Sequence, residues 1–67
     1  MEIYDALKIG VRALREQKLM NHEEFRLTAS KVDDEWVFWF VFLPEAFGKD
    51  VTAIVDRKGN VRTSVGF

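Results

Sequence analysis

Residues 35–44 read EWVFWFVFLP, and every side chain between Glu35 and Pro44 is apolar. A strand of a small antiparallel sheet usually has one face in water and therefore alternates apolar with polar residues. Here phenylalanines alternate instead with valine and tryptophan. Because successive side chains of a strand point to opposite faces, the pattern predicts a strand that is apolar on both sides.

The preceding segment, FRLTASKV at 25–32, is separated from this stretch by Asp33 and Asp34. We predict that these two aspartates form the whole loop of a β-hairpin. Phe25, Leu27 and Ala29 of the first strand then each face a phenylalanine of the second, a match that a one-residue slip would destroy. The predicted pairs are Ala29 with Phe38, Leu27 with Phe40 and Phe25 with Phe42.

A second hairpin is predicted from VTAIVD at 51–56 and VRTSV at 61–65. Gly59 in a left-handed conformation would close a type I turn with a bulge. The predicted pairs are Val55 with Val61, Ala53 with Thr63 and Val51 with Val65.

Residues 3–18 are predicted to form an amphipathic helix. The apolar and small side chains collect on one arc when projected at about 100° per residue. We expect Gly10 to allow close packing on the sheet, Ile9 to face away from the core, and Asn21 to stop the helix. The arc comprises Ile3, Ala6, Leu7, Gly10, Val11, Ala13 and Leu14.

Three basic residues, Lys8, Arg12 and Arg15, lie beside this arc. The simpler interpretation is a solvated flank with Asp5 and Glu16 as partners within the helix. The functional alternative is a surface for an acidic partner.

The predicted architecture is α+β, with one N-terminal helix packed on a four-stranded antiparallel meander, in a single domain of residues 1–67. Phe47, in the longest connection, is expected to fold back against the core edge. One helix covers only one face of such a sheet.

The other face is therefore the candidate binding site. Trp and Arg are enriched where binding energy concentrates, and a buried Trp contributes about 150 to 250 Å² of contact. The candidate protein-binding residues are Val37, Trp39, Val41, Ile54, Arg26 and Arg62. Thr28, Ser30 and Thr52 complete the predicted rim.

Three occupants compete for this face. The first is a second copy of the chain, packed sheet on sheet. The second is another protein, and the third is single-stranded nucleic acid stacked on Trp39. One outward aromatic residue and a net charge of −1 argue against nucleic acid. In a fourth interpretation the chain's own 44–50 loop or its ends fold over the patch.

Composition sets further limits. The chain has 67 residues, 48% hydrophobic and 31% charged, which is typical of a folded domain. A chain of this size buries only about 60% of its unfolded surface, so association would add needed stability. Cysteine is absent, which excludes disulfides and fits a cytoplasmic location. No apolar run approaches the length of about 20 residues that a membrane helix needs.

The second half of the chain is similar to PepSY-type domains and to small bacterial toxin-immunity proteins built as a helix plus a sheet. The residues that carry the resemblance are Trp36, Val37, Val55, Asp56, Gly59 and Val61. The immunity resemblance implies neutralisation of a partner toxin. The PepSY resemblance implies binding or inhibition of a peptidase, or a regulatory module. Neither implies catalysis.

Catalytic and metal-binding patterns are weak. His22 with Glu23 and Glu24 lacks the four ligands of a structural zinc site. Asp33, Asp34 and Glu35 are better explained as turn-forming acids than as a cation site.

Ser30, Thr28 and Ser64 lack a base nearby, since His22 lies at the far end of the first strand. No nucleophile-elbow, P-loop or dinucleotide motif is present. We therefore predict a non-enzymatic protein without a cofactor.

Overall fold

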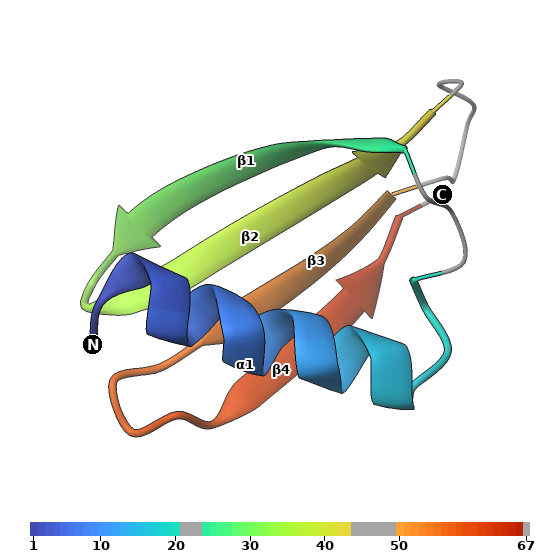
Figure 1. Ribbon diagram of the computed structural model, residues 1–67. Coiled ribbons are helices and arrows are strands. Elements are labelled where there is room, and N and C mark those ends of the chain that lie inside the picture. Colours follow the sequence, from blue (N-terminus) through green and yellow to red (C-terminus); the bar gives the residue numbers. More distant parts are fainter. Residues whose placement is uncertain (21–23, 44–49, 67) are drawn as a thin grey trace.

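The computed structural model describes residues 1–20, 24–43 and 50–66. Helix α1 (Ile3–Glu16) is followed by strands β1 (Phe25–Val32), β2 (Glu35–Phe42), β3 (Asp50–Val55) and β4 (Val61–Val65). The strands form one antiparallel sheet in the order β1-β2-β3-β4, and α1 lies across one face of it (Figure 1). This confirms the predicted fold class. The predicted role of Phe47 lies outside the described residues.

The first hairpin has the predicted register, with Ala29, Leu27 and Phe25 opposite Phe38, Phe40 and Phe42. Asp33 and Asp34 both have positive φ angles, 50° and 64°. Two left-handed residues in a two-residue loop correspond to a type I′ turn, whose twist matches that of the strands. Aspartate tolerates this conformation better than most residues. The turn therefore holds the register that places the phenylalanines on one face.

The second hairpin also has the predicted register, from Val51–Val65 to Val55–Val61. Gly59 has a φ of 89°, a value that glycine adopts without a steric penalty. Its N–H donates to the carbonyl oxygen of Asp56 at 3.0 Å, and the Asp56 N–H donates to the Asn60 carbonyl at 3.0 Å. These bonds close the turn between β3 and β4.

The core lies between α1 and the helix-facing side of the sheet. Gly10 approaches β3 closely: a Cβ atom at this position would lie 3.3 Å from the Cβ of Ala53 and 3.5 Å from the Phe38 ring. The prediction that Gly10 allows close packing is confirmed. The buried core comprises Ala6, Leu14, Phe38, Phe40, Phe42, Val51, Ala53 and Val55.

Trp36, at the start of β2, ties the chain's beginning to the sheet. Its indole N–H donates to the carbonyl oxygen of Met1 at 3.1 Å, and its ring stacks on Phe38 at 6.1 Å between centroids. The Lys31 ammonium lies 5.5 Å from the ring centroid, within cation–π range. Trp36 therefore serves the fold, whereas Trp39 lies on the other face.

Two predictions about the helix are wrong. The helix ends at Glu16, before Asn21, because Lys18 takes a left-handed conformation and the chain turns there. Ile9 packs against the core instead of facing away from it. Gly59 has no side chain, and a Cβ there would lie 3.8 Å from the Ile9 Cδ1 atom, so Ile9 reaches over the β3–β4 turn.

Candidate protein-binding site

The predicted residues come together on the sheet face opposite α1, which we call the open face. Val37, Trp39 and Val41 alternate along β2 with the buried phenylalanines. Ile54 of β3 is the direct cross-strand neighbour of Val37, and Thr52 is the neighbour of Trp39. Arg26 and Arg62 come from the outer strands, opposite Val41 and Ile54. The open face thus has an apolar centre and a polar margin.

Trp39 is the most exposed apolar residue of this centre, with 46% of its surface accessible. Val37, Val41 and Ile54 are half-buried. A tryptophan at the middle of a sheet face is normally covered, since its ring offers a large apolar area to a partner. The chain's own described residues do not cover it.

The Trp39 ring is held in place by Asp50. Its indole N–H donates to the Asp50 carboxylate (Oδ2) at 2.8 Å. Asp50 lies at the start of β3, opposite Val41. The hydrogen bond satisfies the one polar atom of the ring and restricts the ring's orientation.

Asp50 is in turn confined by Gly66. The Gly66 N–H donates to the Asp50 carbonyl oxygen at 2.9 Å. A Cβ atom at residue 66 would overlap the Asp50 carboxylate, so only glycine leaves that carboxylate its place. Sequence reasoning missed Asp50 and Gly66, because their role depends on the pairing of β3 with β2 and on the path of the chain after β4.

The rim carries charges of both signs. Arg62 Nη2 donates to both oxygens of the Glu35 carboxylate, at 3.0 Å each, across the strand between them. Strand pairing places Arg26 and Asp50 on the open face as well, each opposite Val41 on a neighbouring strand. Glu35 is a further residue that the sequence did not assign to the rim. An exposed ion pair of this kind contributes little to stability, but it restricts the positions of the Arg62 and Glu35 side chains.

The two hairpin turns at one end of the sheet border a polar hollow of about 460 Å³. In it, the Asp56 carboxylate accepts hydrogen bonds from the backbone N–H groups of Asn60 and Lys58, both at 2.9 Å. These bonds, that of Asn60 first, hold the pKa of Asp56 below its ordinary value of 3.8. The residues around the hollow are Asp33, Asp34, Glu35, Asp56, Arg57, Lys58 and Asn60.

Across residues 1–20, 24–43 and 50–66, no three acidic or histidine side chains gather closely enough to hold a metal ion. His22 and Glu23 lie outside these ranges. In the same part of the chain, no helix combines the length and the apolar character needed to traverse a bilayer.

Comparisons with family models, with curated proteins and with solved structures found no match for this chain. The resemblance to PepSY-type domains and immunity proteins therefore stays a prediction.

Proposed function

We propose that the chain is a non-enzymatic protein-binding module that forms a homodimer through its open face. The observation that carries the proposal is Trp39, which is 46% exposed at the centre of an apolar sheet face and oriented by Asp50. An exposed apolar patch of a few hundred Å² usually marks an association site.

The open face is small for a dimer interface. Four strands spaced about 4.8 Å apart and about 20 Å long give a projected face of roughly 400 Å². Interfaces of standard size bury about 800 Å² of accessible surface on each partner. The open face is below this size, so we expect a weak dimer that dissociates at roughly micromolar concentration.

The charges of the open face favour a second copy over nucleic acid. It carries charges of both signs, the basic Arg26 and Arg62 beside the acidic Glu35 and Asp50, so two such faces offer opposite charges to each other. Binding of single strands relies on a basic groove with several stacking aromatic rings, whereas this face has one.

Binding of a partner protein is the most concrete biological role for such a module. The resemblance to immunity proteins suggests a toxin, and the resemblance to PepSY-type domains suggests a peptidase. The lack of cysteine supports a cytoplasmic setting for either.

The test is Trp39→Glu, studied by sedimentation at high micromolar protein concentration. We expect the wild type to sediment as a dimer and the variant as a folded monomer, because a carboxylate at the centre of the interface would be desolvated without a partner. Tyr4→Glu is the matched control, since Tyr4 is 68% exposed on α1 and away from the open face.

Either of two results would contradict the proposal. One is a wild type that sediments as a monomer at every concentration. The other is loss of the dimer in Tyr4→Glu but not in Trp39→Glu, which would move the interface to the helix side.

A further inference from the structure

The helix leaves part of its own side of the sheet uncovered. Among the described elements, α1 packs against β2, β3 and β4 but not against β1. Figure 1 shows β1 running along the sheet edge beyond the helix. A helix is about 10 Å across and strands are about 4.8 Å apart, so one helix covers roughly two strands. The strip over β1 and the adjoining part of β2 has room for one more helix.

Apolar side chains lie in this strip. Phe25 and Leu27 of β1 point to the helix side of the sheet yet are 37% and 39% exposed. The Phe25 ring meets the buried Phe40 ring edge-on, at 5.2 Å between centroids. These residues extend the core surface to the sheet edge, where no element of the described chain covers it. The sequence predicted the direction of these side chains but not that the helix stops short of them.

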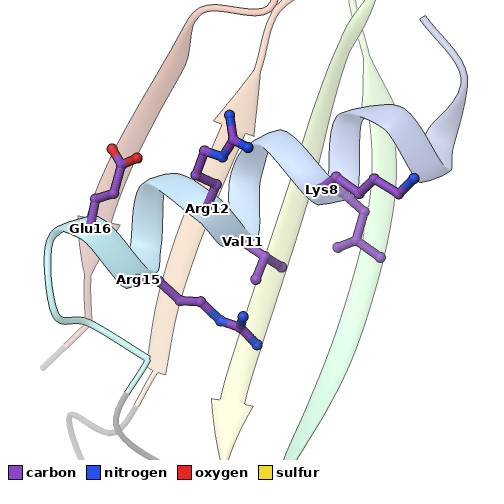
Figure 2. A pocket seen from close by; sticks show the side chains of 6 residues that line it. Lys8, Val11, Arg12, Arg15 and Glu16 are labelled. Carbon is purple, nitrogen blue, oxygen red and sulfur yellow. The ribbon is translucent and has the colours of Figure 1, made fainter.

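A groove of about 480 Å³ follows the helix flank. Leu7 and Val11, both half-buried, give it an apolar base. Figure 2 shows Val11 and Arg15 leaving α1 on the flank that faces β2, while Arg12 leaves on the opposite flank with Glu16. The Lys8 side chain runs along the helix toward its first turn. The residues that line the groove are Leu7, Lys8, Val11, Arg12, Arg15 and Glu16.

The basic residues of the groove are not neutralised locally. In the described part of the chain, none of Lys8, Arg12 and Arg15 forms an ion pair with a carboxylate. The simpler interpretation of this stripe, with Asp5 and Glu16 as its partners, therefore lacks the expected contacts. An apolar base with a row of cations above it is a surface that complements an apolar stripe with acidic flanks.

We propose that this groove docks an amphipathic helix of a partner protein whose flanks are acidic. The docked helix would lie beside α1, which is about 21 Å long at 1.5 Å per residue, and at the usual interaxial distance of about 8 to 10 Å. Its apolar residues would cover Leu27, Phe25 and Val11. Its glutamates would face Arg15 and Lys8.

A second copy of this chain fits the groove less well than an acidic helix. A symmetric dimer through this side would bring the basic stripe against its own copy, and like charges facing each other oppose association. The groove lies on the helix side of the sheet, opposite the open face. A homodimer formed through the open face therefore leaves the groove accessible. The inference does not depend on the proposed homodimer.

The experiment uses a synthetic peptide of about 16 residues, with leucines at helical spacing and glutamates on both flanks. Two control peptides have the same leucines with lysine in place of glutamate, and the same composition in shuffled order. Titration into the ¹⁵N-labelled full chain, followed by amide shifts, measures the affinity and the site. We expect shifts at Leu7, Val11, Leu27 and their neighbours, little change around Trp39, and weak or no binding of either control.

The variant that tests charge recognition is Lys8→Glu with Arg15→Glu, both exposed on α1. Its matched control is Arg57→Glu with Lys58→Glu, which changes the net charge equally on the exposed β3–β4 turn. We expect the helix variant to bind the acidic peptide at least about tenfold more weakly and to gain affinity for the lysine peptide. The affinity of the turn variant for the acidic peptide should stay within about twofold of the wild-type value.

Three results would overturn the proposal. The first is equal weakening by both charge reversals, since binding would then depend on net charge alone. The second is absence of shifts in the groove at millimolar acidic peptide. The third is loss of the homodimer in the helix variant, which would make a second copy the occupant. Circular dichroism of each variant establishes that the fold is retained.

Discussion

Lys18 adopts a backbone conformation that most side chains avoid, with a φ of 60°. The turn it makes has a clear function, because the Leu19 N–H donates to the Leu14 carbonyl at 2.8 Å and the Lys18 N–H to the Arg15 carbonyl at 3.0 Å. This is a Schellman motif, which satisfies carbonyls left over at a helix end and is usually built with glycine at the left-handed position. Neither glycine nor proline stands at residues 17–20, so no residue typical of a helix end marks the turn, which explains the wrong prediction at Asn21.

We expect Lys18→Gly to stabilise the protein by about 0.5 to 1 kcal/mol, because glycine adopts the left-handed conformation without a Cβ penalty. Urea unfolding followed by circular dichroism measures the change. Lys18→Ala is the control, since it removes the same side chain but keeps the Cβ, and it should give no gain. If Lys18→Ala raised the free energy of unfolding equally, the lysine side chain, and not the backbone conformation, would be the source of the destabilisation.

Asp56 links the β3–β4 turn to pH. Its carboxylate accepts from the Asn60 and Lys58 N–H groups, so its pKa in the folded protein is lower than its ordinary value of 3.8. A carboxyl whose pKa is depressed on folding stabilises the fold above 3.8, and this contribution is lost as the pH falls from 3.8 through the lower folded-state pKa.

We expect the difference in melting temperature between wild type and Asp56→Asn to be constant near neutral pH and to shrink on acidification below 3.8. Asparagine keeps an acceptor oxygen at this position, so the comparison isolates the charge. Thermal unfolding by circular dichroism across this range measures it. A difference that is independent of pH down to full acidification would show that the charge of Asp56 has no part in holding the turn.

At the scale of elements, the sequence was most informative where the signal is local. Both hairpin registers were predictable because the turn residues, Asp33-Asp34 and Gly59, sit beside strands whose alternation admits one pairing. The exposure of Trp39 followed from the same alternation. The sideways position of α1 on the sheet was not predictable, because an apolar arc shows which residues face the sheet but not which strands lie beneath them.

The contacts of Asp50 and Gly66 that hold Trp39 in place were not predictable for a related reason. Asp50 reaches Trp39 only through the pairing of β2 with β3, and the connection between these strands is too long for its sequence to define their register, unlike the two-residue Asp33-Asp34 loop. Gly66 confines Asp50 from beyond β4. One hydrogen bond thus depends on residues of β2, of β3 and of the segment after β4. The alternation of side chains along a single strand does not predict such a contact.

We expect Gly66→Ala to displace the Asp50 carboxylate and so to release the Trp39 indole, at a cost of about 1 kcal/mol. The ¹⁵N shift of the Trp39 indole N–H reports the loss directly, and the Trp36 indole serves as an internal reference. In an Asp50→Ala background the same substitution should have a much smaller effect. Equal effects in both backgrounds would show that Gly66 acts independently of the Asp50 side chain.

At the scale of the whole molecule, burial is unevenly shared among the strands. In β3 every second residue is buried, and in β2 the three phenylalanines are buried, whereas all eight residues of β1 are exposed. The helix adds its packing to β2, β3 and β4. Strand β1 therefore depends on its pairing with β2 and on few apolar contacts, such as that of Phe25 with Phe40.

This distribution has a measurable consequence in native-state hydrogen exchange. Regions with few buried apolar contacts open at lower free energy than the global unfolding transition. We expect the β1 amides that bond to β2 to exchange through such a local opening, with protection well below that of the β3 amides. Strand β4, also at a sheet edge but next to the helix, is the matched comparison and should be better protected than β1.

If the acidic peptide occupies the groove, it should raise the protection of the β1 amides selectively, because the bound peptide covers the exposed side of this strand. Equal protection of the β1 and β3 amides in the free chain would mean that the sheet opens as one unit. The exposure of the strip over β1 would then not lower the free energy of opening of that strand.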